Sequence, residues 1–244
     1  MSELLIPLKI HYFWFGGQEK PAKVKKYIDS WKKACPDFEI IEWNENNYDI
    51  HKHPFMEKAY KDKMWAFVSD YARLDVLEQY GGIYLDTDVE VLKDLKNFCS
   101  NQAFIGFERP DLIGDGQGFG GVPHFPIFKE MLQCYEAMDE YIESPKLRTQ
   151  VLLEHGLKLD GSRQSVDGME IYPTDVFCPK SWATGKIKIT ANTYSIHHFA
   201  DTWHGSNNKK YLILMRSLNR LFGEEKGHKK FMKLMELKDK LLKK

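Results

Sequence analysis

Two aspartates, Asp86 and Asp88, stand one residue apart directly after the short apolar run Ile83-Tyr84-Leu85. In an extended backbone, residues i and i+2 project to the same side, so we expect both carboxylates to present oxygens to one point. Such hard oxygen ligands suit Mn²⁺ or Mg²⁺, and Mg²⁺ commonly combines protein carboxylates with the phosphates of its substrate. The spacing therefore predicts a divalent-cation site for a metal-diphosphate compound. For an isolated Asp-x-Asp, the alternative is an ordinary exit from a strand into a turn.

A helix is predicted over residues 64–80, and it leads to the aspartates through the turn Gly81-Gly82. Its apolar residues recur at helical spacing and predict a face turned to the core, made of Phe67, Tyr71, Leu74, Leu77 and Tyr80. Asp70 and Arg73 stand three residues apart and share one face of this helix. On a surface helix, such a pair is usually a weak salt bridge.

The whole string SDYARLDVLEQYGGIYLDTD, residues 69–88, resembles the signature of glycosyltransferase family 32, the sugar transferases with a DXD motif. The Ser-Asp-x-x-Arg helix, the Gly-Gly turn and the DXD stand at the family's spacing. The resemblance runs from about Ile6 to Phe107 and resumes near Thr193. It implies an α/β protein with a GT-A-type nucleotide-diphospho-sugar transferase fold and a mostly parallel central sheet. It also implies a retaining hexosyltransferase similar to capsular-polysaccharide and yeast outer-chain mannosyl enzymes.

The resemblance also implies roles for individual side chains. Asp86 and Asp88 would hold the metal that bridges the donor diphosphate. Asp70 and Arg73 would contact the hydroxyls of the donor sugar, the carboxylate accepting and the guanidinium donating. We assign the catalytic role to these four residues and add Tyr84 to the donor-binding set.

A first strand is predicted over residues 6–15, which are rich in β-branched and aromatic residues and are followed by Gly17. Open α/β sheets build ligand sites at the carboxyl ends of their strands. In family 32 this opening lines the nucleotide pocket, so the resemblance implies that Trp14 stacks on the base. A buried core aromatic is an equal alternative.

Residues 193–203 form the second informative string, a β run that ends in His197-His198 and is followed by Trp203. Two neighbouring residues of an extended run face opposite ways, so at most one of these histidines can reach a cation. The resemblance implies that His198 is the third metal ligand, with a structural histidine as the alternative. It also implies that Trp203 donates its indole N–H to the donor diphosphate.

Residues 114–121 are dense in glycine and contain a formal G-x-G-x-x-G. A dinucleotide site needs a helix that opens on this motif, but Val122-Pro123 follows, so we reject a Rossmann fingerprint. Two expectations remain for this segment. One is a glycine-hinged mobile loop near the sugar or acceptor, and the other is a plain surface loop.

The rest of the chain alternates predicted strands and helices, as in a parallel sheet with crossover connections. Residues 209–244 are more basic than the rest of the chain. They contain twelve Lys and Arg against four Asp and Glu and carry a net charge of +8. Their apolar residues fall on helical faces. We therefore predict a catalytic domain over residues 1–208 and a basic amphipathic helical extension over residues 209–244. The extension either lies on an anionic membrane or packs back on the domain.

The four cysteines form no CxxC pair, which argues against a zinc knuckle or a disulfide scaffold. The N-terminal residues lack the features of a signal peptide, and no window reaches the roughly 18 apolar residues of a membrane-spanning helix. Lys plus Arg equals Asp plus Glu at 35 each, so we expect no nucleic acid partner. We expect a cytoplasmic protein, free or peripheral on the inner face of the membrane.

The sequence thus predicts a Mn²⁺- or Mg²⁺-dependent enzyme that moves a hexose from a nucleoside diphosphate sugar, with a UDP-sugar favoured. The acceptor would be a hydroxyl of a glycan or lipid-linked glycan in capsule, lipopolysaccharide or similar surface polysaccharide synthesis. The alternative is a nucleotide-sugar or glycan-binding module without turnover, against which the intact DXD argues. A phosphohydrolase would need a further carboxylate cluster, and none stands at suitable spacing. The sugar, the acceptor, the linkage and the oligomeric state stay open.

Overall fold

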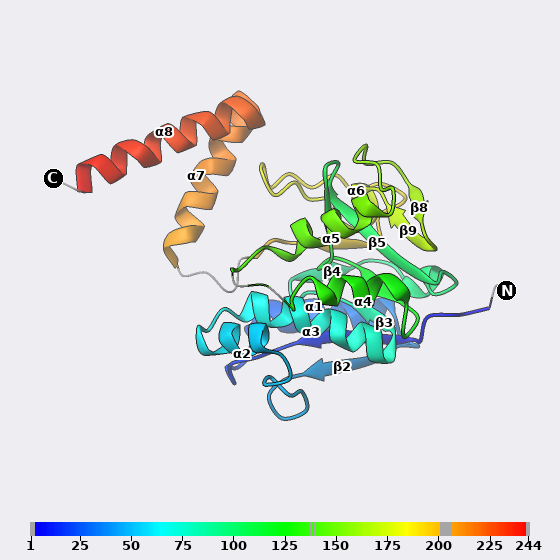
Figure 1. Cartoon of the computed structure of the whole chain (residues 1–244). Coiled ribbons are helices and arrows are strands. Elements are labelled where there is room, and N and C mark those ends of the chain that lie inside the picture. Colours follow the sequence, from blue (N-terminus) through cyan, green and yellow to red (C-terminus); the bar gives the residue numbers. More distant parts are fainter. Residues whose placement is uncertain (1–2, 137, 139, 201–205, 243–244) are drawn as a thin grey trace. The chain divides into compact units, whose positions relative to one another are not determined.

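The computed structural model describes residues 3–136, 138, 140–200 and 206–242 (Figure 1). The chain divides into two compact units. The first consists of the described parts of residues 1–179 and 189–198, and the second of residues 180–188 and the described parts of 199–244. The unit that holds the C-terminal helices therefore also includes a short segment, 180–188, which the predicted boundary at residue 209 had left in the catalytic domain.

The first unit is built on a mixed sheet that has eight strands within the described residues, in the order β2-β1-β3-β7-β5-β9-β8, with β6 paired to β5. Its strands are β1 (Lys9–Phe13), β2 (Glu39–Trp43), β3 (Gly82–Tyr84), β5 (Ala103–Arg109), β6 (Leu112–Gly114), β7 (Phe119–Gly121), β8 (Gln164–Val166) and β9 (Met169–Tyr172). β1 is parallel to β2 and β3, and β5 is parallel to β9. β7 is antiparallel to both β3 and β5, so five strands run in one direction. This arrangement agrees with the predicted α/β class and mostly parallel sheet.

Helices pack on both faces of this sheet. They are α1 (Ala22–Ala34), α2 (Pro54–Lys61), α3 (Trp65–Tyr80), α4 (Pro126–Gln133), α5 (Ser144–Glu154), α6 (Thr174–Phe177) and the 3₁₀ helix Leu95–Phe98. Two neighbouring residues of β5 show that the sheet has an apolar core on each face. Phe104 joins the core that contains α1 and α6, whereas Ile105 joins the core that contains α2, α3, α4 and α5. A strand with both faces covered reads as a continuous apolar run, which is how β5 reads in the sequence.

α3 is buried along its whole central part, residues 68–77, because it packs against α2, α4, β1 and β3. The buried surface of α3 is therefore wider than the predicted apolar face. Tyr80, which was expected on that face, is exposed. Asp70 and Arg73 are both buried, so the weak surface salt bridge is excluded. Burial removes both charged groups from water, and this desolvation costs free energy of folding.

The glycine-rich segment 114–121 is buried throughout, so the predicted plain surface loop was wrong. It forms the end of β6, the whole of β7 and the buried turn between them. A Cβ atom on Gly120 would lie 2.5 Å from the Gly82 carbonyl oxygen, and one on Gly121 would lie 2.6 Å from the Phe128 ring. The glycines therefore allow close packing of neighbouring backbone and rings.

The second unit contains two helices, α7 (Ser206–Phe222) and α8 (Glu224–Leu242), joined at Gly223 with a φ of 80°. Segment 180–188 packs on α7, where Asn219 Nδ2 donates to the Ala183 carbonyl at 2.9 Å and Arg216 Nε donates to the Trp182 carbonyl at 2.9 Å. Within the described residues, no helix has both the length and the apolar character needed to cross a bilayer.

His155, at the C-terminal end of α5, joins three elements of the first unit. Its Nε2 lies 2.7 Å from Glu130 Oε2 on α4, and its Nδ1 lies 2.6 Å from Asp167 Oδ2 in the turn between β8 and β9. Hydrogen bonds to Asp167 and Glu130 raise the pKa of His155 above its usual range. The charged ring therefore stabilises the fold fully below its unfolded pKa of about 6.5, and this stabilisation is lost as the pH rises through the raised folded pKa.

We expect Asp167→Asn to lower the free energy of unfolding by about 0.5–1 kcal/mol at about pH 5.5 and by less at about pH 9. Asn tolerates the φ of 43° at this position, so the charge is the main change. Urea unfolding at both pH values measures the difference. The control is Asp37→Asn, which removes a partner of Lys96 that keeps its charge over this range. An equal loss at both pH values for Asp167→Asn would contradict the role given to His155.

Candidate active site

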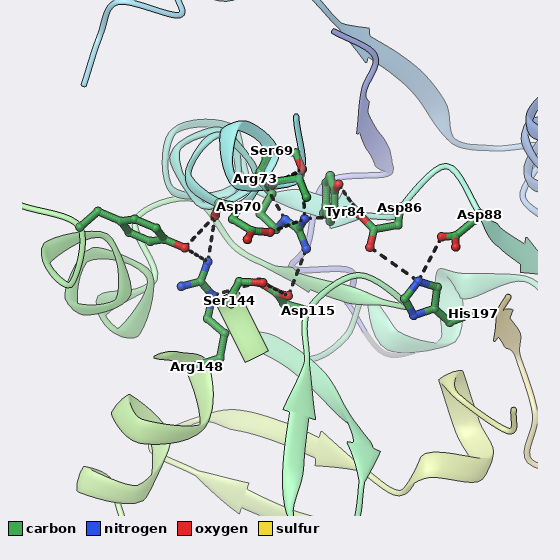
Figure 2. Close-up of polar contacts among 12 residues, drawn as sticks. Ser69, Asp70, Arg73, Tyr84, Asp86, Asp88, Asp115, Ser144, Arg148 and His197 are labelled. Carbon is green, nitrogen blue, oxygen red and sulfur yellow. Dashed lines mark hydrogen bonds and ion pairs between the residues drawn. The ribbon is translucent and has the colours of Figure 1, made fainter. Parts of the chain in front are cut away.

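The Asp86-Thr87-Asp88 run lies in a turn, and not in the extended strand that its spacing suggested. β3 ends at Tyr84, and the Val89 amide donates to the Asp86 carbonyl at 3.0 Å before β4 (Val89–Val91) begins. The two carboxylates nevertheless converge on one ring nitrogen (Figure 2). His197 Nε2 lies 3.0 Å from Asp88 Oδ1 and 3.8 Å from Asp86 Oδ2.

The histidine beside the DXD carboxylates is His197, and the predicted metal ligand His198 lies elsewhere. β10 (Ser195–His197) pairs antiparallel with β4, which sets His197 opposite Val89. The His198 ring faces the other way, where its Nε2 lies 2.9 Å from Glu90 Oε2 and the ring stacks on Tyr27 at 4.7 Å. The two histidines face opposite ways, as predicted, and the pairing of β10 with β4 turns His197 to the carboxylates in place of His198.

Asp86, Asp88 and His197 together can hold a divalent cation. One ligand atom from each lies within 4.8 Å of the other two. Burial alone would lower the pKa of His197, but the attraction of Asp88 and a hydrogen bond to it raise that pKa well above its usual range. The carboxylates of Asp86 and Asp88 thus favour a positive charge at the point where they converge. Two carboxylate oxygens and one imidazole nitrogen are a donor set that fits a first-row divalent metal.

Arg73 is the centre of a second, buried cluster, which Figure 2 shows beside the first. Its Nη2 lies 2.8 Å from Asp70 Oδ1 and 3.4 Å from Asp86 Oδ1, and its Nη1 lies 3.1 Å from Asp115 Oδ1. Its Nε donates to the Ser69 carbonyl at 3.1 Å, and Nη2 donates to the Ser69 hydroxyl at 3.2 Å. The structure therefore brings the predicted pair Asp70 and Arg73 next to the DXD through Asp86.

Tyr84, which we had placed in the donor-binding set, lies between the two clusters. Its hydroxyl donates to Asp86 Oδ1 at 2.6 Å, and the Arg73 guanidinium carbon lies 4.5 Å from its ring centroid. The Tyr84 side chain is itself buried. It therefore orients Asp86 and Arg73 in this structure.

Asp115, which the sequence reasoning missed, comes from the glycine-rich segment. Its neighbour Gly116 packs directly on the DXD: the Asp86 amide donates to the Gly116 carbonyl at 2.7 Å, and a Cβ atom on Gly116 would lie 1.9 Å from Asp86 Oδ2. Only a glycine lets the backbone approach the carboxylate this closely. The one acid in a run of buried glycines was the available signal.

Arg148 and Ser144 of α5 were also missed, and both contact Asp115. Arg148 Nε donates to Asp115 Oδ2 at 3.0 Å, and the Ser144 hydroxyl donates to Asp115 Oδ1 at 2.9 Å. In the sequence, Arg148 stands three and four residues before the buried Val151 and Leu152. A charged residue on an apolar helix face was the signal that could have found it.

The two buried carboxyl groups of this cluster titrate differently. Burial raises the pKa of Asp70, and the guanidinium of Arg73 opposes that rise only in part. Burial also acts to raise the pKa of Asp115, but Arg73 and Arg148 outweigh it and lower the pKa below its usual value. Asp115 is therefore held ionised between two guanidinium groups, whereas Asp70 takes up a proton more readily.

Trp14 and Trp203 were both predicted to bind the donor. Trp14 is buried in the core that contains α1, its indole N–H donates to the Gln18 carbonyl, and Lys20 Nζ lies 5.8 Å from its ring centroid. Stacking of Trp14 on a base stays a prediction. Trp203 lies outside the described residues.

Comparisons with known proteins match part of this chain. Residues 21–105 match the family described as "Glycosyltransferase sugar-binding region containing DXD motif". An uncharacterized glycosyltransferase, L373, of Acanthamoeba polyphaga mimivirus is 32% identical over 136 residues, which are 51% of this chain and 53% of the relative. Inositol phosphoceramide mannosyltransferase 2 of Schizosaccharomyces pombe is 29% identical over 148 residues, which are 55% of this chain and 40% of the relative.

Among solved structures, the PaToxG glycosyltransferase superimposes with a TM-score of 0.50 at 19% identity, over 61% of this chain and 68% of that one. This likeness supports the predicted GT-A-type fold. The fold is therefore of the GT-A class. The family match covers residues 21–105 and confirms the predicted resemblance to the DXD-motif glycosyltransferases of family 32. The chain spans about half or less of the length of these curated relatives.

The neighbouring histidines provide a matched pair of variants. We expect His197→Asn to weaken Mn²⁺ binding by about 100-fold or more, because it removes a nitrogen that faces both DXD carboxylates. His198→Asn should leave the affinity within about 3-fold, since that ring contacts Glu90 and Tyr27 instead. Titration of Mn²⁺ followed by electron paramagnetic resonance measures both. Loss of affinity only in His198→Asn would restore the original assignment.

Proposed function

We propose that this chain is a metal-dependent retaining glycosyltransferase that moves a hexose from a nucleoside diphosphate sugar, preferably a UDP-sugar, to a glycan hydroxyl. One observation carries the proposal. Asp86 contacts the ring of His197 with one oxygen and the guanidinium of Arg73 with the other. A cation site and a buried sugar-binding pair therefore meet at one carboxylate, as a sugar diphosphate requires.

The donor diphosphate would bind at Asp86, Asp88 and His197. A cation held there, Mn²⁺ or Mg²⁺, would supply Lewis-acid stabilisation of the charge that develops on the departing nucleotide. The imidazole favours Mn²⁺, since nitrogen ligands suit transition metals better than Mg²⁺. The half-buried Asp86 carboxylate would keep its orientation without reorganisation, because the Tyr84 hydroxyl donates to it and the Asp86 amide donates to the Gly116 carbonyl.

The donor sugar would lie against the Asp70 and Arg73 side of the site. Arg73 presents a fixed fork of N–H donors, and Asp70, whose Oδ1 pairs with Arg73, is a buried acceptor that would meet a sugar hydroxyl. A retaining outcome would require the acceptor hydroxyl to approach from the face that the nucleotide leaves. The printed name of the mannosyltransferase relative supports a lipid-linked acceptor, and we extend this to capsule, lipopolysaccharide or similar surface polysaccharide synthesis.

The test is a thermal-shift panel of nucleoside diphosphate sugars with and without Mn²⁺, because a ligand that binds the native state must raise the melting temperature. A shift that needs both Mn²⁺ and one particular donor is the expected result. The panel should be paired with an assay for donor hydrolysis, which a transferase performs slowly without an acceptor. A shift without any hydrolysis would favour the binding module, and no shift with any donor would contradict the donor site.

We also propose that the second unit contacts an anionic membrane from the cytoplasmic side. Its helices expose Ile213 at 65% and Leu221 at 75%, beside Phe222, over which Lys230 Nζ lies at 4.4 Å from the ring centroid. Exposed apolar side chains among lysines match the boundary between lipid headgroups and acyl chains. Each Lys or Arg near such a surface contributes about 1 kcal/mol at low salt.

Vesicle sedimentation measures this association. We expect the protein to bind phosphatidylglycerol vesicles and to stay in solution with pure phosphatidylcholine vesicles. Leu221→Asp should weaken binding by about 10-fold, because it removes an apolar contact and adds a negative charge. The control is Leu159→Asp, an exposed leucine of the first unit. Equal binding to both vesicle types would contradict the electrostatic part of the proposal.

A further inference from the structure

Arg148 is the most deeply buried charged side chain of the cluster around Arg73, with 0% of its side chain exposed. It extends from α5 and holds two other elements. Its Nε donates to Asp115 Oδ2 at 3.0 Å, and its Nη2 donates to the Asp70 carbonyl at 2.9 Å and to the Tyr135 hydroxyl at 3.0 Å. Arg148 therefore links the glycine-rich segment to the backbone of α3.

Asp115 transmits this link to Arg73, because its two oxygens serve different guanidinium groups. Oδ2 accepts from Arg148, whereas Oδ1 lies 3.1 Å from Arg73 Nη1 and 2.9 Å from the Ser144 hydroxyl. The carboxylate cannot rotate without breaking one of these contacts. The contacts from Arg148 and Ser144 of α5 thus fix the plane of the Asp115 carboxylate. This plane limits the orientation of the Arg73 guanidinium.

We propose that Arg148 is a positioning residue of the donor site, which through Asp115 holds the Arg73 guanidinium against Asp70 and Asp86 without touching the donor itself. The inference rests on the proposed function, since it assigns Arg73 to the donor sugar. It adds a residue of α5, Arg148, to a site whose recognised motifs lie on α3 and the turn after β3.

Stability alone is a poor explanation for Arg148. Its Nη1 is buried and has no hydrogen-bond partner among the described residues, and such an orphaned donor costs free energy. Buried ion pairs can often be replaced as a whole by apolar side chains of similar volume at no cost to stability. An apolar replacement of the whole Arg148–Asp115 pair would therefore serve packing equally well, whereas a positioning role requires the guanidinium fork.

The first test follows the Arg73 side chain directly. In ¹⁵N-labelled protein, the Nε–H signal of Arg73 is identified by its absence in Arg73→Lys. We expect Arg148→Met to shift this signal and to speed its exchange with water by about 10-fold or more, because Asp115 no longer holds the fork. Arg163→Met is the matched control, since Arg163 also pairs with a carboxylate, Glu170, and lies over a tyrosine ring.

The second test measures donor consumption. We expect Arg148→Met to lower kcat/KM for the donor by about 100-fold, the loss that a misplacement of about 1 Å can cause. Mn²⁺ affinity should stay within about 3-fold, because Arg148 contacts none of the three proposed ligands. Arg148→Lys keeps the charge but not the fork, so it should recover only part of the loss.

A double-mutant cycle separates positioning from a general structural role. If Arg148 acts through Asp115, the variant that combines Arg148→Met with Asp115→Asn should be no more than about 3-fold worse than Asp115→Asn alone. Independent, multiplying losses would overturn the proposal, as would a fall in Mn²⁺ affinity and melting temperature that parallels the loss of rate. If Arg148→Met does not fold, Arg148→Lys carries both tests.

The two tests also separate this inference from the proposed function. A wild-type protein that consumes no donor would refute the transferase, and the Arg73 signal would still report whether Arg148 positions Arg73. A working transferase with an unchanged Arg73 signal in Arg148→Met would refute the inference alone.

Discussion

Replacement of Asp88 by Asn is expected to abolish the Mn²⁺-dependent binding of a nucleoside diphosphate sugar and to lower turnover by about 1,000-fold or more. Asp88 Oδ1 lies 3.0 Å from His197 Nε2 and is one of three converging ligand atoms. An amide of the same shape keeps the packing but lacks the charge that attracts a cation. Thermal shift with Mn²⁺ and donor, together with the rate of donor hydrolysis, measures the effect.

The control for this variant is Asp111→Asn, which removes an exposed carboxylate paired only with Arg109 among the contacts we describe. It should leave binding and rate unchanged. Far-ultraviolet circular dichroism checks that both variants keep the fold. Full turnover in Asp88→Asn would refute the assignment of the cation site, and turnover that no longer depends on Mn²⁺ would refute the role of the metal.

Arg73→Lys should produce the second large effect, a fall in turnover of about 100- to 1,000-fold with Mn²⁺ affinity retained within about 3-fold. Arg73 contacts the carboxylates of Asp70, Asp86 and Asp115 at once. A lysine ammonium is a point charge on a flexible stem, so it cannot reach all three in a fixed geometry. The comparison of kcat, KM for the donor and Mn²⁺ affinity measures the effect.

Arg109→Lys is the matched control, because it changes an exposed arginine that pairs with Asp111. Loss of rate in Arg73→Lys with an equal loss of Mn²⁺ binding would mean that Arg73 maintains the metal cluster and not the sugar contact. We also expect the free energy of unfolding of Arg73→Lys to fall by about 1–3 kcal/mol, because buried acceptors lose partners.

Asp86 links these two predictions. Its Oδ1 contacts Arg73 and accepts from the Tyr84 hydroxyl, whereas its Oδ2 faces His197. The cation site and the sugar-binding pair that we propose therefore share one side chain. The Arg73 guanidinium orients the Asp86 carboxylate, and three acids balance its charge.

Much of the local structure was readable from the sequence. The helix over residues 64–80, the Gly81-Gly82 turn and the apolar run after it were predicted within one or two residues of α3 and β3. Positive φ values of 61° and 103° explain the two glycines. These features depend on neighbours in the chain, so spacing and residue type are sufficient to find them.

The choice between His197 and His198 could not be made from residues that are neighbours in the chain. The sequence established that His197 and His198 face opposite sides, but only the pairing of β10 with β4 decides which side meets the DXD. Likewise, the glycine-rich segment was read as a loop because its own sequence contains no apolar alternation. Its burial follows from close contact with Gly82, which is distant in the chain, and with the Phe128 ring of α4.

The sequence by itself determined the class of protein, the DXD pair and the Asp70-x-x-Arg73 helix, because these residues lie within one short string whose spacing carries the chemistry. The tertiary structure alone decided that Asp115 and Arg148 complete the cluster, since Asp115 reaches Arg73 from the glycine-rich segment and Arg148 reaches Asp115 from α5. It also decided that the charges are buried. Burial depends on what packs from outside the string, and burial turns an ordinary helix salt bridge into the fixed pair that we propose as the donor-sugar site.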